Sequence, residues 1–175
     1  MSKWIALLRG INVGGKNRIL MADLREALSS SGLEEVQTYI QSGNLIFSSR
    51  LSAAEIRKRI CATINTGWNI DVPVLVIKAS ELARIQSDNP YESLDPKSVH
   101  LTLLGKKPAA DAVKRVCQVD VGDDQFQIVG KCVYVHCPSG YAKTKIHNNF
   151  FEQKLGVLAT SRNWKTVCKL VDLSQ

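Results

Sequence analysis

The order of predicted strands and helices repeats along this chain, and that repeat constrains the fold more than any single motif. In residues 1–87 the hydrophobic pattern predicts a buried strand, a helix, a hairpin, a second helix, a strand and a short helix. After a turn-rich connection at 88–97, residues 98–175 start the same order again. We therefore predict an α+β fold (an α/β sandwich): two ferredoxin-like βαββαβ units in tandem with an added C-terminal helix.

The predicted elements have the following bounds. In the first unit, strands are predicted at 3–9, 36–40, 45–48 and 72–78, and helices at 21–31, 53–66 and 80–85. In the second, strands are predicted at 99–104, 125–129 and 132–136, and helices at 109–117, 147–155 and 163–171. Ser52 and Glu55 predict a capping box for the second helix. The second unit shows no clear closing strand, and no residue-level repeat relates the two units.

The strands of the second unit predict a sheet with one apolar and one polar face. Val99, Leu101 and Leu103 alternate with polar residues, so we expect them to share the core face with the apolar residues of the hairpin. A polar face can hold single-stranded nucleic acid, but here only Tyr134 offers a ring for base stacking. A solvated face, or one between domains, is therefore the preferred interpretation.

The formal net charge of +7 arises at the two ends of the chain. Residues 1–20 hold four basic groups and no acid, and residues 139–175 hold six basic groups and two acids. If the ends meet in space, they form one electropositive patch that attracts anions. The alternative is that these lysines and arginines only solvate the protein.

A glycine-rich loop follows the first predicted strand. Residues 10–17 read G-x-x-x-x-G-K-N, one residue short of a nucleotide-binding P-loop. Asn17 stands where a hydroxyl should hold Mg²⁺, and the predicted helix begins only at residue 21. We therefore favour an anion-binding or structural turn over nucleotide hydrolysis.

The segment 160–166 (TSRNWKT) precedes the last predicted helix. Its hydroxyl and amide side chains suit the N-terminal cap of that helix, whereas Arg162 and Lys165 oppose the helix dipole unless an anion or an acidic partner lies there. Trp164 is expected to fill the core.

Other chemistry is excluded or not indicated. The sequence contains no zinc-binding pattern and no hydrolase motif, so we expect no metal and no cofactor. Five scattered cysteines suit a reducing cytoplasm better than a disulfide framework. No secretory signal and no apolar run long enough for a membrane span is present. The sequence does not indicate an oligomeric state.

Several strings together resemble a known family. They are ALLRGINVGGK at 6–16, MADLR at 21–25, TYIQSGN at 38–44 and TSRNWKTV at 160–167, with Lys145, Glu152 and Leu155-Gly156. These resemble the bacterial domain-of-unknown-function family 1697 (DUF1697) along essentially the whole chain. The resemblance implies a small cytosolic α/β protein of ferredoxin-like halves without an established activity, and it supplies no catalytic residues.

We interpret the chain as a binding module for an anion. A basic cleft between the glycine-rich loop and the C-terminal segment would hold a phosphate-bearing small molecule or a nucleic-acid backbone. Its expected lining residues are Arg9, Asn12, Gly14, Gly15, Lys16, Asn44, Lys145, Arg162 and Asn163. One alternative is a hydrolase or transferase for a phosphorylated substrate, with His147 or Glu152 as the base. The other is a structural or protein-interaction module without a small ligand.

Overall fold

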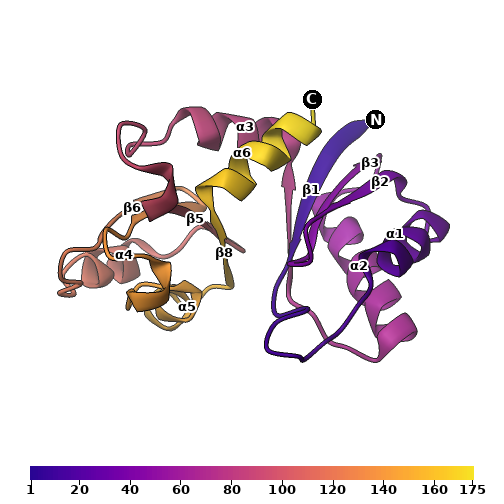
Figure 1. Ribbon diagram of the computed structural model, residues 1–175, viewed down its shortest axis with the longest axis horizontal. Helices are drawn as coiled ribbons and strands as arrows, with labels where there is room; N and C mark the ends of the chain where they lie inside the picture. The colour runs from indigo at the N-terminus through magenta and orange to yellow at the C-terminus, as the bar shows by residue number, and fades with distance from the viewer. The chain divides into compact units, whose positions relative to one another are not determined.

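The computed structural model describes residues 1–175 and contains two βαββαβ units, each followed directly by a helix (Figure 1). The first consists of β1 (Ser2–Leu8), α1 (Met21–Ser30), β2 (Glu34–Tyr39), β3 (Asn44–Ser49), α2 (Ala53–Trp68), β4 (Val74–Lys78) and α3 (Ala79–Ser87). The second consists of β5 (Val99–Leu104), α4 (Ala110–Val116), β6 (Gln125–Val129), β7 (Cys132–His136), α5 (Asn148–Leu155), β8 (Ala159–Asn163) and α6 (Trp164–Leu173). Short 3₁₀ turns η1 (Pro96–Ser98) and η2 (Tyr141–Lys143) complete the chain. The predicted α+β fold of tandem ferredoxin-like units is confirmed.

Both sheets are four-stranded and antiparallel, with the same strand order: β2-β3-β1-β4 in the first and β6-β7-β5-β8 in the second. The expectation that the second unit lacks a closing strand is wrong, because β8 pairs with β5 and places Ala159 opposite Leu104. Thr160 and Ser161 lie inside β8 and do not cap α6. The strand escaped prediction because it contains a single aliphatic side chain, Ala159, and polar residues that also suit a helix cap.

The core of the first unit lies between its sheet and the helices α1 and α2, which Figure 1 shows on the same face of that sheet. Trp4, Ala6 and Leu8 of β1 belong to this core. From α2 it receives residues at a spacing of four, Ile56, Ile60 and Ile64, all fully buried. The predicted capping box is present: Ser52 and Glu55 each bond the other's backbone N–H at the start of α2.

The predicted core face of the second sheet is right for the hairpin, whose residues Val133 and Val135 belong to the core with α4 and α5, and wrong for β5. Leu101 of β5 lies opposite Tyr134 of β7, so Val99, Leu101 and Leu103 share the face that α4 and α5 do not cover. That face is nevertheless buried, since Leu101 and Tyr134 are each 1% exposed. The Tyr134 hydroxyl donates to the carbonyl of Ile85 in α3, 2.9 Å away. As a central strand, β5 is covered on both sides, and its apolar residues therefore do not mark one core face.

Contacts within the chain group it into two compact units. One contains Met1–Arg84 together with Leu170–Gln175, and the other contains Ile85–Lys169. The predicted connection at 88–97 thus belongs to the second unit, and the last six residues join the first.

No helix in the chain combines the length and the apolar character needed to cross a membrane.

Candidate functional site

Two asparagines hold the glycine-rich loop between β1 and α1 in shape. The Asn12 Nδ2 atom donates to the carbonyls of Ile19 and Gln41, both at 2.9 Å, and its Oδ1 accepts from the Ile19 N–H, also at 2.9 Å. The Asn17 Nδ2 atom donates to the Gly10 carbonyl at 2.9 Å. Both asparagines have a φ near +50°, which asparagine tolerates better than most residues do. The side chain of Asn12 therefore organises the loop, and its predicted role toward a ligand stays a prediction.

The tip of this loop is a tight turn with free donors. The Lys16 N–H donates to the Val13 carbonyl at 3.1 Å, which leaves Gly14 and Gly15 exposed between them with positive φ. The N–H groups of these two glycines donate to no group of the protein. Consecutive free N–H groups in such a turn favour the binding of an anion.

Two cations accompany the turn. The side chains of Lys16 and Arg18 are exposed and form no ion pair within the chain. An arginine guanidinium binds phosphate as a two-pronged donor, and lysine binds it as a point charge. The loop therefore carries two different kinds of side chain that can bind a phosphate.

A hollow of about 680 Å³ lies beside this loop, and we call it the loop hollow. It is lined by Asn12, Gly15, Arg18, Ile19, Leu20, Asp23, Gln41 and Trp68. Its size falls within the range of small-molecule sites. Of the site residues predicted from the sequence, Asn12 and Gly15 line this hollow.

The remaining lining residues of the loop hollow were not predicted as site residues. Arg18 belongs to the basic N-terminal stretch, so its charge was a usable signal. Trp68 ends α2, and Gln41 lies in the β2–β3 turn. Only the fold brings these distant segments to the loop.

Two further predicted residues of the first unit have structural surroundings. Asn44 is fully buried, and its Nδ2 atom donates to the Tyr39 carbonyl and the Ser42 hydroxyl at 3.0 Å, which braces the β2–β3 turn. Arg9 directly follows β1 and is half-buried, and its backbone N–H donates to the carbonyl of Pro73 at 3.0 Å. Neither residue lines the loop hollow.

The predicted C-terminal site residues belong to the second unit. Lys145 is exposed between η2 and α5. Arg162 lies in β8, where burial lowers the pKa of its guanidinium to about 10. Asn163 caps α6, because its Oδ1 accepts from the Thr166 N–H at 2.8 Å. That these residues join the glycine-rich loop in one cleft stays a prediction.

The chain ends meet within the first unit. A hollow of about 430 Å³ is lined by residues of both, among them Ser2, Lys3, Val171 and Ser174. The basic residues between 139 and 169, however, lie in the second unit. Of the cations near this hollow, Lys3 pairs with Glu35 at 3.0 Å and Lys78 lies over the Trp4 ring at 5.7 Å.

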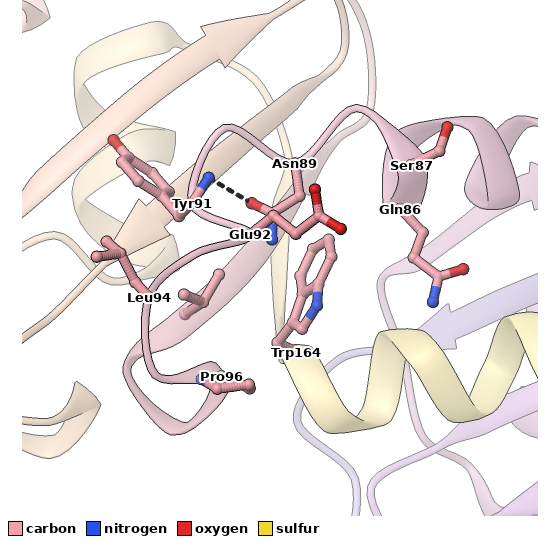
Figure 2. A pocket seen from close by; sticks show the side chains of 9 residues that line it. Gln86, Ser87, Asn89, Tyr91, Glu92, Leu94, Pro96 and Trp164 are labelled. Carbon is pink, nitrogen blue, oxygen red and sulfur yellow. Dashed lines mark hydrogen bonds between the residues drawn. The ribbon is translucent and has the colours of Figure 1, made fainter.

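A smaller hollow of about 240 Å³ lies in the second unit (Figure 2). Figure 2 shows the Trp164 indole rising from the start of α6 toward Glu92. No basic residue lines this hollow, and Glu92 contributes a carboxylate, so its chemistry does not suit a phosphate. Trp164 is 8% exposed, in agreement with its predicted place in the core.

Comparison with known families identifies the family of this chain. Residues 1–134 match the family model described as a protein of unknown function, DUF1697. The chain belongs to the DUF1697 family. A solved structure, described as that of the conserved bacterial protein SP0830 from Streptococcus pneumoniae, is similar with a TM-score of 0.81 and 24% sequence identity, over 99% of each chain. This likeness concerns the fold. A comparison with curated proteins found no match.

The catalytic candidates of this DUF1697 chain do not line the loop hollow. The Glu152 Oε1 atom accepts from the Ala159 N–H at 3.0 Å, so this carboxylate ties α5 to the start of β8. His147 is exposed at the N-terminal end of α5 and makes no side-chain cap bond there. Neither lines the loop hollow, where Asp23 is the carboxylate.

Proposed function

We propose that the protein binds a phosphate-bearing small molecule at the loop hollow. The observation that carries this proposal is that the glycine turn and Arg18 border the same hollow. The free N–H groups of Gly14 and Gly15 and the unpaired guanidinium of Arg18 offer a phosphate hydrogen bonds and charge together. Lys16 adds a further positive charge at the turn.

The lining residues other than the glycine turn and Arg18 favour a ligand in which the phosphate is attached to a larger group. Trp68 offers a flat apolar surface, on which an aromatic ring can stack. Gln41 offers an amide, and Asp23 accepts hydrogen bonds from hydroxyl groups. A carboxylate repels a bare phosphate but suits the hydroxyls of a sugar. A mononucleotide combines all of these groups, so we propose it as the ligand class.

A titration series tests the ligand class. Calorimetry or thermal shift would compare inorganic phosphate, ribose 5-phosphate, adenosine and AMP at low salt. We expect AMP to bind tighter than ribose 5-phosphate, and ribose 5-phosphate tighter than phosphate. An equal lack of stabilisation by all four compounds would contradict the proposal.

Substitutions test the position of the site. Arg18→Gln should weaken the binding of AMP and of ribose 5-phosphate by at least about tenfold, because a charge-assisted bidentate contact is lost. Arg50→Gln is the matched control: it removes the same charge from an exposed arginine of the same unit that does not line the hollow. Equal losses in both variants would show a general charge effect and contradict a site at Arg18.

Salt dependence separates a small ligand from a nucleic acid. A single-stranded oligonucleotide with about six phosphate contacts would lose roughly four decades of affinity per tenfold increase in salt. Binding of AMP through one phosphate should vary far less.

The five cysteines are unpaired, which supports our further proposal that the protein works in the reducing cytoplasm.

A further inference from the structure

The strands β2 and β6 occupy the same edge position in the two sheets, and β2 is protected against pairing with another chain. Its register against β3 shifts between Glu34 and Gln37, where Glu35 has a φ of 51°. Hydrogen bonds from Ser48 and Lys3 hold the Glu35 side chain in place and lower its pKa. A bulge and charged side chains are the usual means by which an edge strand avoids a further strand.

The edge strand β6 has none of this protection. Its sequence, QFQIV, contains no charge and no proline, and its register against β7 is unbroken from Gln125 to Val129. A two-residue turn, Gly130-Lys131, joins the two strands, so Val129 and Cys132 form a hydrogen-bonded pair. By alternation, Phe126 and Ile128 then direct their backbone N–H and C=O groups away from β7.

The apolar side chains of β6 lie at the margin of the core. Phe126 and Ile128 are half-buried against the core of the second unit, and the Phe126 ring contacts that of Phe151 with centroids 5.4 Å apart. On the other face of the strand, Val129 is 53% exposed. A further strand beside β6 would cover these partly exposed side chains and gain from their burial.

We propose that β6 pairs antiparallel with β6 of a second copy of this chain and so joins two four-stranded sheets into one. The strand is self-complementary about Gln127. With the two-fold axis there, Phe126 lies opposite Ile128 of the second copy, and their outward-directed backbone groups form the hydrogen-bonded pair. Gln127 then lies opposite its own copy in a non-hydrogen-bonded pair.

The charges that flank β6 fit the same register. Asp123 lies in the turn before the strand and Lys131 in the turn after it, so antiparallel pairing about Gln127 brings the Asp123 end of one strand beside the Lys131 end of the other. Both side chains are exposed and form no ion pair within the chain. A parallel pairing would bring Asp123 against Asp123, so the charges favour the antiparallel arrangement.

The paired strand is short, with five residues, so the contact belongs to the class of small, weak interfaces. We therefore expect an equilibrium between monomer and dimer that shifts with protein concentration. Sedimentation velocity of the full chain over a wide concentration range measures it. A single monomeric species at every concentration would overturn the proposal.

Substitution of the central residue tests the location of the interface. Gln127→Lys places two ammonium groups side by side at the two-fold axis and should abolish the dimer, whereas the exposed position leaves the monomer folded, as circular dichroism would check. Gln37→Lys is the matched control, because it makes the same change at an exposed position of the protected edge β2. If both variants retain the dimer, or both lose it, β6 is not the interface.

Charge reversal tests the register. Asp123→Lys alone and Lys131→Asp alone should each weaken dimerisation, by roughly tenfold, because two attractive pairs become repulsive. The double variant restores both pairs and should recover the wild-type dissociation constant. A double variant weaker than either single variant would overturn the antiparallel register.

A cysteine introduced at the two-fold axis tests the pairing of the two β6 strands through disulfide cross-linking. In a non-hydrogen-bonded pair the Cα atoms lie about 4.5 Å apart, within the range that a disulfide spans. In a Cys117→Ser background, which removes the exposed native thiol, Gln127→Cys should form a disulfide-linked dimer under mild oxidation. Gln37→Cys is the control, and equal rates of cross-linking in the two variants would contradict the pairing.

Discussion

The side-chain amide of Asn12 donates to the backbone carbonyl of Gln41, 2.9 Å away and 29 positions further along the chain. Through this bond the glycine-rich loop is attached to the β2–β3 turn, and both segments line the loop hollow. Asn12 also bonds the backbone of Ile19 through both its Nδ2 and Oδ1 atoms. One side chain therefore fixes the wall of the candidate site.

Asn12→Ala should destabilise the protein by about 2–4 kcal/mol. Backbone groups lose their partners at a cost of about 1–3 kcal/mol, and alanine tolerates the left-handed φ of 53° less well, at about 1 kcal/mol. Urea unfolding measures the change. Asn69→Ala is the control, since Asn69 has the same φ but no side-chain bond to another segment. Equal losses in the two variants would mean that the Asn12 bonds contribute nothing.

Gly43→Ala should be more damaging than Gly14→Ala. A Cβ atom at Gly43 would lie 2.6 Å from the Leu8 Cβ and 2.7 Å from the Ile11 Cδ1, whereas one at Gly14 meets nothing within 4 Å. Both glycines have a positive φ, so both variants pay for a left-handed alanine, about 1–2 kcal/mol. The overpacking adds about 1–3 kcal/mol at Gly43 alone. Denaturant midpoints of the two variants compare the effects, and equal midpoints would contradict the close approach.

The sequence predicted those parts of the fold that depend on local pattern. The spacing of Ile56, Ile60 and Ile64 and the Ser52–Glu55 capping box identified α2, because helix periodicity and caps are local signals. β8 was missed because a closing strand is stabilised by its partner β5, and Thr160 and Ser161 carry no apolar alternation. Strand pairing is a property of the whole unit and leaves little trace in the strand itself.

The candidate site was predicted only as far as its loop. Gly14, Gly15 and Lys16 stand together in the sequence, so their turn chemistry was readable. Trp68 and Gln41 reach the same hollow from α2 and from the β2–β3 turn, and no local pattern connects them with the loop. A pocket that is assembled from distant segments can be identified only from the tertiary structure.

Ile40→Asn should stabilise the protein by about 1 kcal/mol. Ile40 has a φ of 51°, a conformation that β-branched residues adopt at a cost, and its side chain is 49% exposed, so little packing is lost. Thermal unfolding measures the gain. Val129→Asn is the control, measured at a protein concentration where the chain is monomeric, because it also removes an exposed branched side chain but lies in a regular strand. A loss of stability in Ile40→Asn equal to that in the control would contradict backbone strain at Ile40.

Stability should fall as the pH is lowered from 7 toward 5.5, in part because of His100. This side chain is buried and stacks on the Tyr141 ring with centroids 4.2 Å apart, and its Nδ1 atom has no hydrogen-bond partner. Burial lowers its pKa below the ordinary value of 6.5, while a backbone hydrogen bond at Ser98 opposes that shift. The folded state therefore keeps His100 neutral at a pH where the unfolded chain binds a proton.

The direction of the pH effect on stability follows from the number of protons that the folded and the unfolded state bind. Above the unfolded pKa, near 6.5, His100 is neutral in both states and the pH has no effect through it. Below it the unfolded state binds the additional proton, so the free energy of unfolding decreases, by at most about 1.4 kcal/mol per pH unit, until the folded pKa is reached. His100→Phe keeps a ring against Tyr141 and should reduce this slope. Unfolding curves at pH 7 and pH 5.5 compare this variant with the wild-type protein, and an unaltered slope in His100→Phe would show that the buried imidazole is not the source.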